Sequence, residues 1–133
     1  MIIRRTERIK SNLKGTIIDI ETIGKPCNWY NDSRTYQEIS PTVFGYIDKG
    51  GLTIRCAKGM RAIKGLKKRI VQMLPTLQRP LFAFNCCFER GVLFHSCRVT
   101  LDFKGELNKE RFESKGAAVA SLGISNYDDP FND

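Results

Sequence analysis

The segment from residue 15 to residue 24 constrains the fold more than any other part of the sequence. It reads Gly-Thr-Ile-Ile-Asp-Ile-Glu-Thr-Ile-Gly, an apolar run that ends at a glycine, and this pattern predicts a mostly buried β-strand. Side chains two residues apart on a strand point to the same face, so Asp19 and Glu21 share one face while Ile18 and Ile20 point into the core. Acids inside an apolar strand need a neutralising positive charge, because unpaired buried charge is costly. A bound metal ion and a structural salt bridge to Lys or Arg are the two alternatives.

Further strands follow from β-rich runs and turn residues. We expect strands at residues 42–48 and 52–57, joined by a hairpin turn at 49–51, so that the first three strands form a meander. The run 81–84 is wholly apolar, which is typical of a central strand covered on both faces. Another strand is expected at residues 98–102.

Helices are predicted between these strands. Apolar residues at spacings of three and four predict a helix over residues 60–74, which Pro75 ends. Asn85 stands where it can cap the next helix, and Gly123 stands where a C-terminal cap belongs after a helix at 108–122. The order is then β-β-β-α-β-α-β-α, an α/β fold with a mixed sheet and helices packed against it.

Length and composition bound the class of protein. With 133 residues and 41% apolar content, residues 1–133 are expected to form a single domain. No apolar run is long enough for a membrane span, and the first residues alternate Ile with Arg and Lys, so we expect a cytoplasmic protein without membrane association. The five cysteines include no Cys-x-x-Cys spacing and one histidine accompanies them, which favours reduced thiols over a zinc site.

The charge of the chain favours a polyanionic partner. A formal net charge of +8 suits binding to nucleic acid, since Lys and Arg displace counterions from phosphates. Arg61, Lys64 and Lys68 fall on one stripe of the helix predicted at 60–74 and are candidates for contact with a phosphate backbone. A solvated basic face is the alternative, because surface helices usually have one.

Two short blocks resemble the DEDD-type 3′-to-5′ exonucleases of the ribonuclease H-like superfamily. Residues 17–24 resemble that family's opening Asp-x-Glu-Thr-x-Gly motif, and residues 84–89, Phe-Asn-Cys-Cys-Phe-Glu, are similar to its Asn-x-x-Phe-Asp block. The resemblance implies a ribonuclease H-like mixed sheet and hydrolysis of phosphodiester bonds in single-stranded nucleic acid. It assigns Asp19, Glu21 and Glu89 as catalytic residues that ligate Mg²⁺ or Mn²⁺, with two ions expected.

The same resemblance assigns substrate contacts and exposes two departures. Asn85 would orient the second block or contact substrate, and Thr22 would contact substrate. Glu89 stands where an aspartate is usual, and the family's final motif, Tyr-x-x-x-Asp or His-x-x-x-Asp, does not occur in the chain, in which we also identify no counterpart of the family's closing helix. Candidates for a fourth carboxylate are Asp102, Asp128, Asp129 and Asp133.

Three hypotheses follow from these departures. The first is a metal-dependent 3′-to-5′ exonuclease. The second is a catalytically degenerate module that binds nucleic acid or a protein partner. The third is that the chain is a fragment, or a subunit of an oligomer, whose last carboxylate comes from another polypeptide.

The loop at residues 25–41 and His95 each leave two interpretations open. Trp29, Tyr30 and Tyr36 could stack on nucleic-acid bases or pack against the edge of the sheet. His95 could act as a general base, but its position at the far end of a predicted helix favours a structural role.

Overall fold

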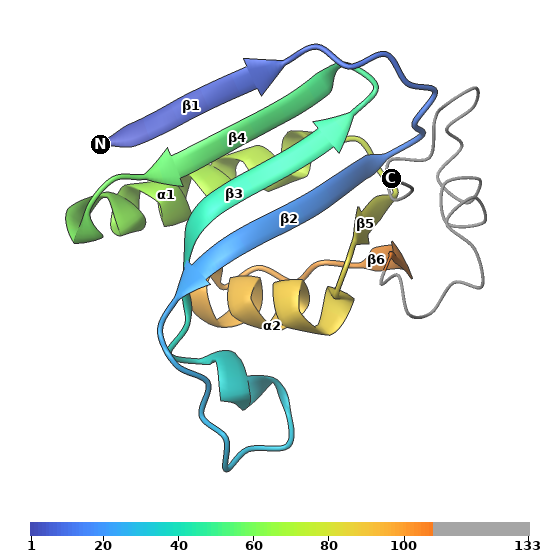
Figure 1. Cartoon of the computed structure of the whole chain (residues 1–133). Helices are drawn as coiled ribbons and strands as arrows, with labels where there is room; N and C mark the ends of the chain where they lie inside the picture. The colour runs from blue at the N-terminus through green and yellow to red at the C-terminus, as the bar shows by residue number, and fades with distance from the viewer. Residues whose placement is uncertain (108–133) are drawn as a thin grey trace, which may run out of the picture.

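The computed structural model describes residues 1–107 and shows a six-stranded sheet with two α-helices (Figure 1). The strands are β1 (Ile2–Glu7), β2 (Thr16–Ile23), β3 (Ser40–Asp48), β4 (Gly51–Ala57), β5 (Leu81–Ala83) and β6 (Phe103–Glu106). The α-helices are α1 (Met60–Met73) and α2 (Cys86–Cys97), and two 3₁₀ turns are η1 (Ser33–Tyr36) and η2 (Leu74–Thr76). No helix in this part of the chain has an apolar stretch long enough to cross a bilayer.

The sheet is mixed, with the strand order β1-β4-β3-β2-β5-β6. The pairs β1–β4, β4–β3 and β3–β2 are antiparallel, whereas β2–β5 and β5–β6 are parallel. The antiparallel part arises from short connections, and the parallel part arises because α1 and α2 carry the chain back before β5 and β6. The predicted α/β class, with a mixed sheet and helices against it, is confirmed.

Both α-helices cover one face of the sheet, as Figure 1 shows for α1 under β3 and β4 and for α2 near β2 and β5. The main core lies in this layer, where Ile18 and Phe44 from the sheet are fully buried with Leu66 and Ile70 from α1. Val92 and Leu93 of α2 belong to the same core, as do other residues of both layers. We call this side of the sheet the helix-covered face.

The other side, which we call the open face, is covered by no helix of residues 1–107. A smaller cluster of Leu13, Phe82 and Leu107 lies at one end of it, with Ile17 and Phe84 among the half-buried residues packed against it. The two faces therefore differ in how far their apolar side chains are removed from water.

Two glycines frame β2. Gly15 and Gly24 have φ values of 113° and 114°, in the left-handed region that favours glycine. A Cβ at Gly15 would collide with the carbonyl oxygen of Pro80, and one at Gly24 would collide with the carbonyl oxygen of Glu38. The strand that carries the predicted acids thus begins and ends at close backbone contacts.

The structure corrects one predicted strand and adds one that was not predicted. The segment 98–102 forms no strand: α2 ends at Cys97, Arg98 has a left-handed φ of 58°, and β6 begins only at Phe103. The edge strand β1 was not predicted, because only Ile2 and Ile3 are half-buried, the rest of the strand is exposed, and its place is specified by pairing to β4. The helix predicted at 108–122 and its Gly123 cap lie outside the described residues.

Candidate acidic site

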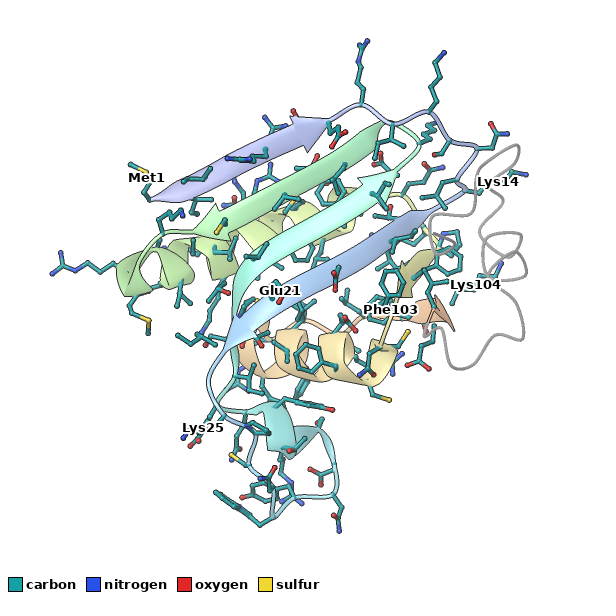
Figure 2. The ribbon with its side chains drawn as sticks, viewed as in Figure 1. Met1, Lys14, Glu21, Lys25, Phe103 and Lys104 are labelled. Carbon is teal, nitrogen blue, oxygen red and sulfur yellow. The ribbon has the colours of Figure 1, made fainter. Side chains whose placement is uncertain are left out.

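The acid pair of β2 lies on the open face. The burial of β2 alternates, so that Ile18 and Ile20 enter the core while Asp19 and Glu21 are exposed on the opposite side, as predicted. Figure 2 shows Glu21 on the C-terminal half of β2. A shallow groove of about 330 Å³ on this face is lined by both acids together with half-buried apolar residues of β3 and β4, and by Phe84.

Glu89 reaches the site from α2. The helix begins soon after β5 ends, so Glu89 lies in its first turn. Its side chain is 3% exposed, and its Oε2 atom has no hydrogen-bond partner among residues 1–107. A buried carboxylate oxygen without a donor is unfavourable, and a cation is one group that would satisfy it.

Electrostatic coupling links the three predicted acids. Burial above all, together with the charges of Asp19 and Glu106, raises the pKa of Glu89 to about 7, although nearby backbone N–H groups lower it. Burial and then the charge of Glu21 raise the pKa of Asp19, while the Ile20 N–H, 3.1 Å from Asp19 Oδ1, lowers it. Asp19 therefore interacts with both other acids.

The structure does not bring all three carboxylates into one tight ligand set. Within residues 1–107, no three His, Cys, Asp or Glu side chains stand close enough together to hold one ion jointly. Negatively charged carboxylates repel each other, so without a cation between them it is energetically unfavourable for these side chains to come closer together. The charge of Glu21 acts on Asp19 and that of Asp19 acts on Glu89, and we call these three residues the acid row.

Asn85 begins α2 but does not cap it with its side chain. The Asn85 carbonyl accepts the backbone N–H groups of Phe88 and Glu89 at 2.9 and 3.1 Å, whereas its exposed side chain makes no capping hydrogen bond. Glu106 takes that role, because its Oε1 accepts the Cys86 N–H at 3.1 Å. The predicted position of the helix start was right, and the predicted side-chain cap was wrong.

Glu106 is the site residue that sequence reasoning missed. It lies on β6 opposite Ala83, and its charge is one of those that raise the pKa of Glu89. Because the last strand was predicted at 98–102, Glu106 was not expected to lie on a strand beside the start of α2. Asp102, a candidate fourth carboxylate, is exposed in the connection before β6, and the candidates Asp128, Asp129 and Asp133 lie outside the described residues.

Thr22 and the predicted basic residues lie apart from the acid row. Thr22 is half-buried at a register shift in the β2–β3 ladder, one residue beyond Glu21. Arg61, Lys64 and Lys68 are exposed on α1, which packs on the helix-covered face and therefore lies across the sheet from Asp19. Lys64 alone of the three lines a hollow of about 490 Å³ that includes Ile23 and Gly24 at the end of β2.

The loop after β2 packs on α2. Tyr36 contacts Gly91 and meets Phe88 edge to face, with ring centroids 5.5 Å apart. Trp29 is 74% exposed. Of the two interpretations of this aromatic loop, the structure shows packing for Tyr36, and it leaves Trp29 accessible.

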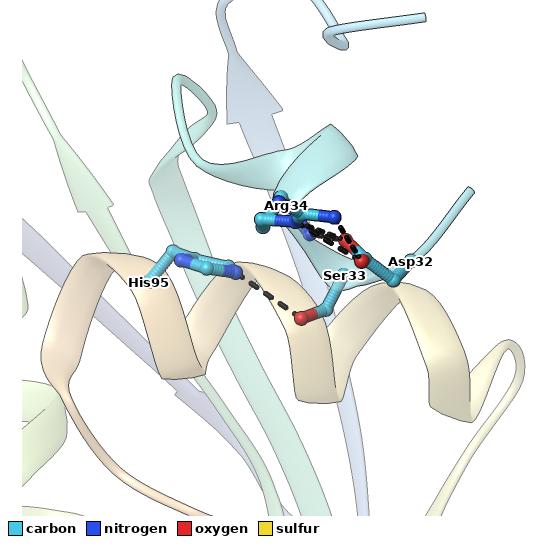
Figure 3. Close-up of polar contacts among 4 residues, drawn as sticks. All are labelled: Asp32, Ser33, Arg34 and His95. Atoms are coloured by element: carbon cyan, nitrogen blue, oxygen red, sulfur yellow. Dashed lines mark hydrogen bonds and ion pairs between the residues drawn. The ribbon is translucent and has the colours of Figure 1, made fainter. Parts of the chain in front are cut away.

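His95 is part of the same contact. Its Nε2 atom lies 3.2 Å from Ser33 Oγ, as Figure 3 shows beside the pair of Asp32 and Arg34. Arg34 hydrogen-bonds Asp32 from its side chain and its backbone N–H, which lowers the pKa of Asp32 to about 2. His95 joins the loop to α2, which agrees with the structural role favoured for it.

The cysteines are free thiols, and comparison with other proteins identifies no relative. None of the five forms a disulfide, and no cluster of them could hold a metal within residues 1–107. No family model, no curated protein and no solved structure matches the chain.

Proposed function

We propose that this domain is a ribonuclease H-like, divalent-metal-dependent nuclease that trims single-stranded nucleic acid from its 3′ end. One observation carries the proposal: the buried Glu89 has a carboxylate oxygen without a partner among residues 1–107, and the charge of Asp19 on β2 acts on it. Repelling carboxylates in a low-dielectric setting cost free energy unless a cation neutralises them. A structural salt bridge would do the same, but none of these three acids makes an ion pair with a residue of 1–107.

The residues fit a hard divalent cation. Asp19, Glu21 and Glu89 offer carboxylate oxygens, which Mg²⁺ and Mn²⁺ prefer. Because no three such side chains of residues 1–107 stand close enough to hold one ion jointly, the proposal requires them to approach when the ion binds. When bound at such a site, these ions, of which we expect two, lower the pKa of a water and stabilise negative charge on a phosphate. The exposed carboxylates of Asp19 and Glu21 line the groove, whereas the carboxylate of Glu89 is buried.

The order of elements supports the ribonuclease H-like assignment. From β2 to β6 the chain runs β-β-β-α-β-α-β, which is the order the resemblance implies, preceded by β1. The acid pair lies on β2, and Glu89 lies on the helix that follows β5, the parallel neighbour of β2. Two blocks far apart in the sequence are thereby placed next to each other.

Other residues near the acids are suited to contact the substrate. Asn85 presents an exposed amide at the start of α2, where it can hydrogen-bond a nucleotide. Val43, Gly45 and Ile54 line the groove beside the acids and offer an apolar floor on which a base can lie. No side chain is needed as a nucleophile, because the attacking group in this chemistry is water.

An oligonucleotide assay tests the proposal. End-labelled single-stranded DNA and RNA are incubated with the protein and Mn²⁺, or with a chelator, and the products are resolved by length. We expect metal-dependent shortening from the 3′ end. Asp19→Asn should reduce the rate by about 100-fold or more, because even the loss of a residue that only hydrogen-bonds a metal ligand lowers metal affinity or activity by about 10–100-fold.

Asp48→Asn is the matched control. Asp48 lies at the end of β3, where its Oδ1 accepts the Gly50 N–H at 2.8 Å, a bond that asparagine can retain. This variant should trim like the unmodified protein. Binding of oligonucleotide without any shortening would instead support the degenerate binding module, and an absence of both would leave a protein-interaction role.

Binding of Mn²⁺ alone gives a readout that does not depend on activity. A ligand that binds only the folded state stabilises it, by about 2.7 kcal/mol at a concentration about 100 times the Kd. Mn²⁺ should therefore raise the Tm of the unmodified protein and of Asp48→Asn, and should raise that of Asp19→Asn much less. Equal shifts in all three would contradict the assignment of Asp19 as a ligand.

A further inference from the structure

Two arginines face each other across the outermost pair of strands. β1 and β4 pair in antiparallel register, and Arg4 stands directly opposite Arg55. Side chains opposed in this way have Cβ atoms about 5 Å apart, and like charges at that distance destabilise the pair. Neither arginine makes an ion pair with any residue of 1–107. Within this part of the chain, the pair opposes folding.

The surroundings of Arg55 do little to offset this repulsion. Arg55 is half-buried, and its Nη1 donates to the Sδ atom of Met73 at 2.8 Å. A thioether is a weak acceptor, and a guanidinium has five N–H donors to satisfy. The thioether is also the one acceptor that residues 1–107 offer to this side chain.

Helix α1 brings a third arginine to the same place. Gly65 of α1 lies against Ile2 of β1, and Met73 of α1 touches Arg55. Arg4 lies two strand residues beyond Ile2, about 6.6 Å along β1. Arg69 lies one helical turn beyond Gly65, about 6 Å along α1. Arg69 is therefore level with Arg4, and we call Arg4, Arg55 and Arg69 the arginine cluster.

The rest of α1 strengthens the positive charge around this cluster. The helix has five basic residues and no acidic residue: Arg61, Lys64, Lys67, Lys68 and Arg69. None of these side chains makes an ion pair with a residue of 1–107. Lys64 and Lys67 line the hollow at the end of β2, whereas Arg69 follows Gly65 on the side of α1 next to β1, the edge strand among residues 1–107.

We propose that the arginine cluster binds phosphate groups of a polynucleotide, as a second contact separate from the acid row. The inference rests on the proposed function for the class of partner. Planar guanidinium groups bind phosphate through paired hydrogen bonds, and an anion between Arg4 and Arg55 removes their mutual repulsion. A phosphate chain also matches the excess of positive charge on α1, which has five basic residues and no acidic one.

The placement of the two sites sets a minimum length for a nucleic acid that touches both. Three strand spacings separate β1 from β2, about 14 Å in all, and the cluster lies on the helix side of the sheet while Asp19 lies on the open face. A mononucleotide cannot span that path. The cluster should therefore affect the binding of long strands and leave the turnover of very small substrates unchanged.

Charge reversal at Arg4 tests the inference. Fluorescence anisotropy with a labelled single strand of about 20 nucleotides, in chelator, measures binding without hydrolysis. Arg4→Glu should weaken binding about tenfold, and should reduce the dependence of log K on log salt by about 0.7 for each phosphate that the variant no longer neutralises. The variant should remain folded, since it replaces a like-charge pair across β1 and β4 by an opposite-charge pair.

Lys104→Glu is the matched control, because it makes the same change of charge on β6, the opposite edge strand. Equal weakening by both variants would overturn the inference in favour of a general charge effect, and so would an unchanged affinity in Arg4→Glu. Stronger dependence on Arg4 in binding to vesicles of anionic lipid than to the oligonucleotide would also overturn it.

Hydrolysis of a p-nitrophenyl ester of a mononucleotide with Mn²⁺ separates this inference from the proposed function. Arg4→Glu should hydrolyse the ester at the unmodified rate. If the unmodified protein hydrolyses nothing while Arg4→Glu still binds the oligonucleotide about tenfold more weakly, the nuclease proposal fails and the phosphate-binding site stands.

Discussion

The two faces of the sheet use the same strands for different purposes. On the helix-covered face, Ile18 and Phe44 are fully buried against α1 and α2, whereas on the open face Asp19 and Glu21 stand among half-buried apolar residues. Because β2 alternates, adjacent residues of one strand stabilise the core and present the acids. Stability and chemistry are thus separated across the thickness of a single sheet.

The largest expected difference between the faces is in stability. Ile18→Ala should lower the free energy of unfolding by about 2–5 kcal/mol, because it leaves a cavity in a packed core. Ile17→Ala makes the same change one residue earlier, on the half-buried open face, and should cost less than half as much. Urea denaturation measures both, and equal costs would show that the open face is as well packed as the covered one.

An effect of similar size is expected from Glu89, with a defined dependence on pH. Its pKa is about 7 in the folded protein against an ordinary value of 4.5, so the folded state holds the proton more tightly. The free energy of unfolding should then fall by up to about 3 kcal/mol as pH rises from about 4.5 to about 7. Above about pH 7 it should not fall further on account of this group. Glu89→Gln has no charge to bury and should lose this dependence.

The measurement is urea denaturation of both proteins in chelator at several pH values. Glu89→Gln should equal the unmodified protein near about pH 4 and exceed it above about pH 7. Glu38→Gln, at an exposed position in the loop before β3, should follow the unmodified protein throughout. Parallel pH profiles for Glu89→Gln and the unmodified protein would contradict a buried, unneutralised carboxylate.

The smallest expected effect connects the open face to Glu89. The charge of Asp19 is one cause of the raised pKa of Glu89, after burial. Asp19→Asn should therefore lower the pKa of Glu89 while leaving it above the ordinary value, as followed by NMR of the glutamate carboxyl carbon. Asp48→Asn should leave it unchanged, and an identical titration in the two variants would show that the acids of β2 do not reach Glu89.

The sequence predicted the elements whose signals are local. The alternation in β2, the hairpin between β3 and β4, and the amphipathic pattern of α1 each lie within one short window, and the structure confirms all of them. The same holds for the opposite orientation of Asp19 and Ile18, which follows from strand geometry alone. Such features need no knowledge of what packs against them.

Features that depend on distant partners could not be predicted. The edge strand β1 exists because it pairs with β4, far along the chain, and Glu106 caps α2 only because β6 lies beside β5. The packing of Tyr36 on Gly91 likewise joins a loop to a helix that follows it by many residues. In the acid row, the pair on β2 was visible in the sequence, while the burial of Glu89 required the fold.

The short strand β5 and the start of α2 soon after it determine where Glu89 lies relative to β2. Ala83, its last residue, pairs with Ile18, so the strand stops one step short of Asp19 and the helix starts at Cys86. Val92 and Leu93 hold α2 in the core, so one residue inserted in the helix between Glu89 and Val92 would turn Glu89 by about 100° about the helix axis. Glu89 would then point away from β2 while every strand kept its place, so the orientation of this carboxylate depends on its helical spacing from the core residues of α2.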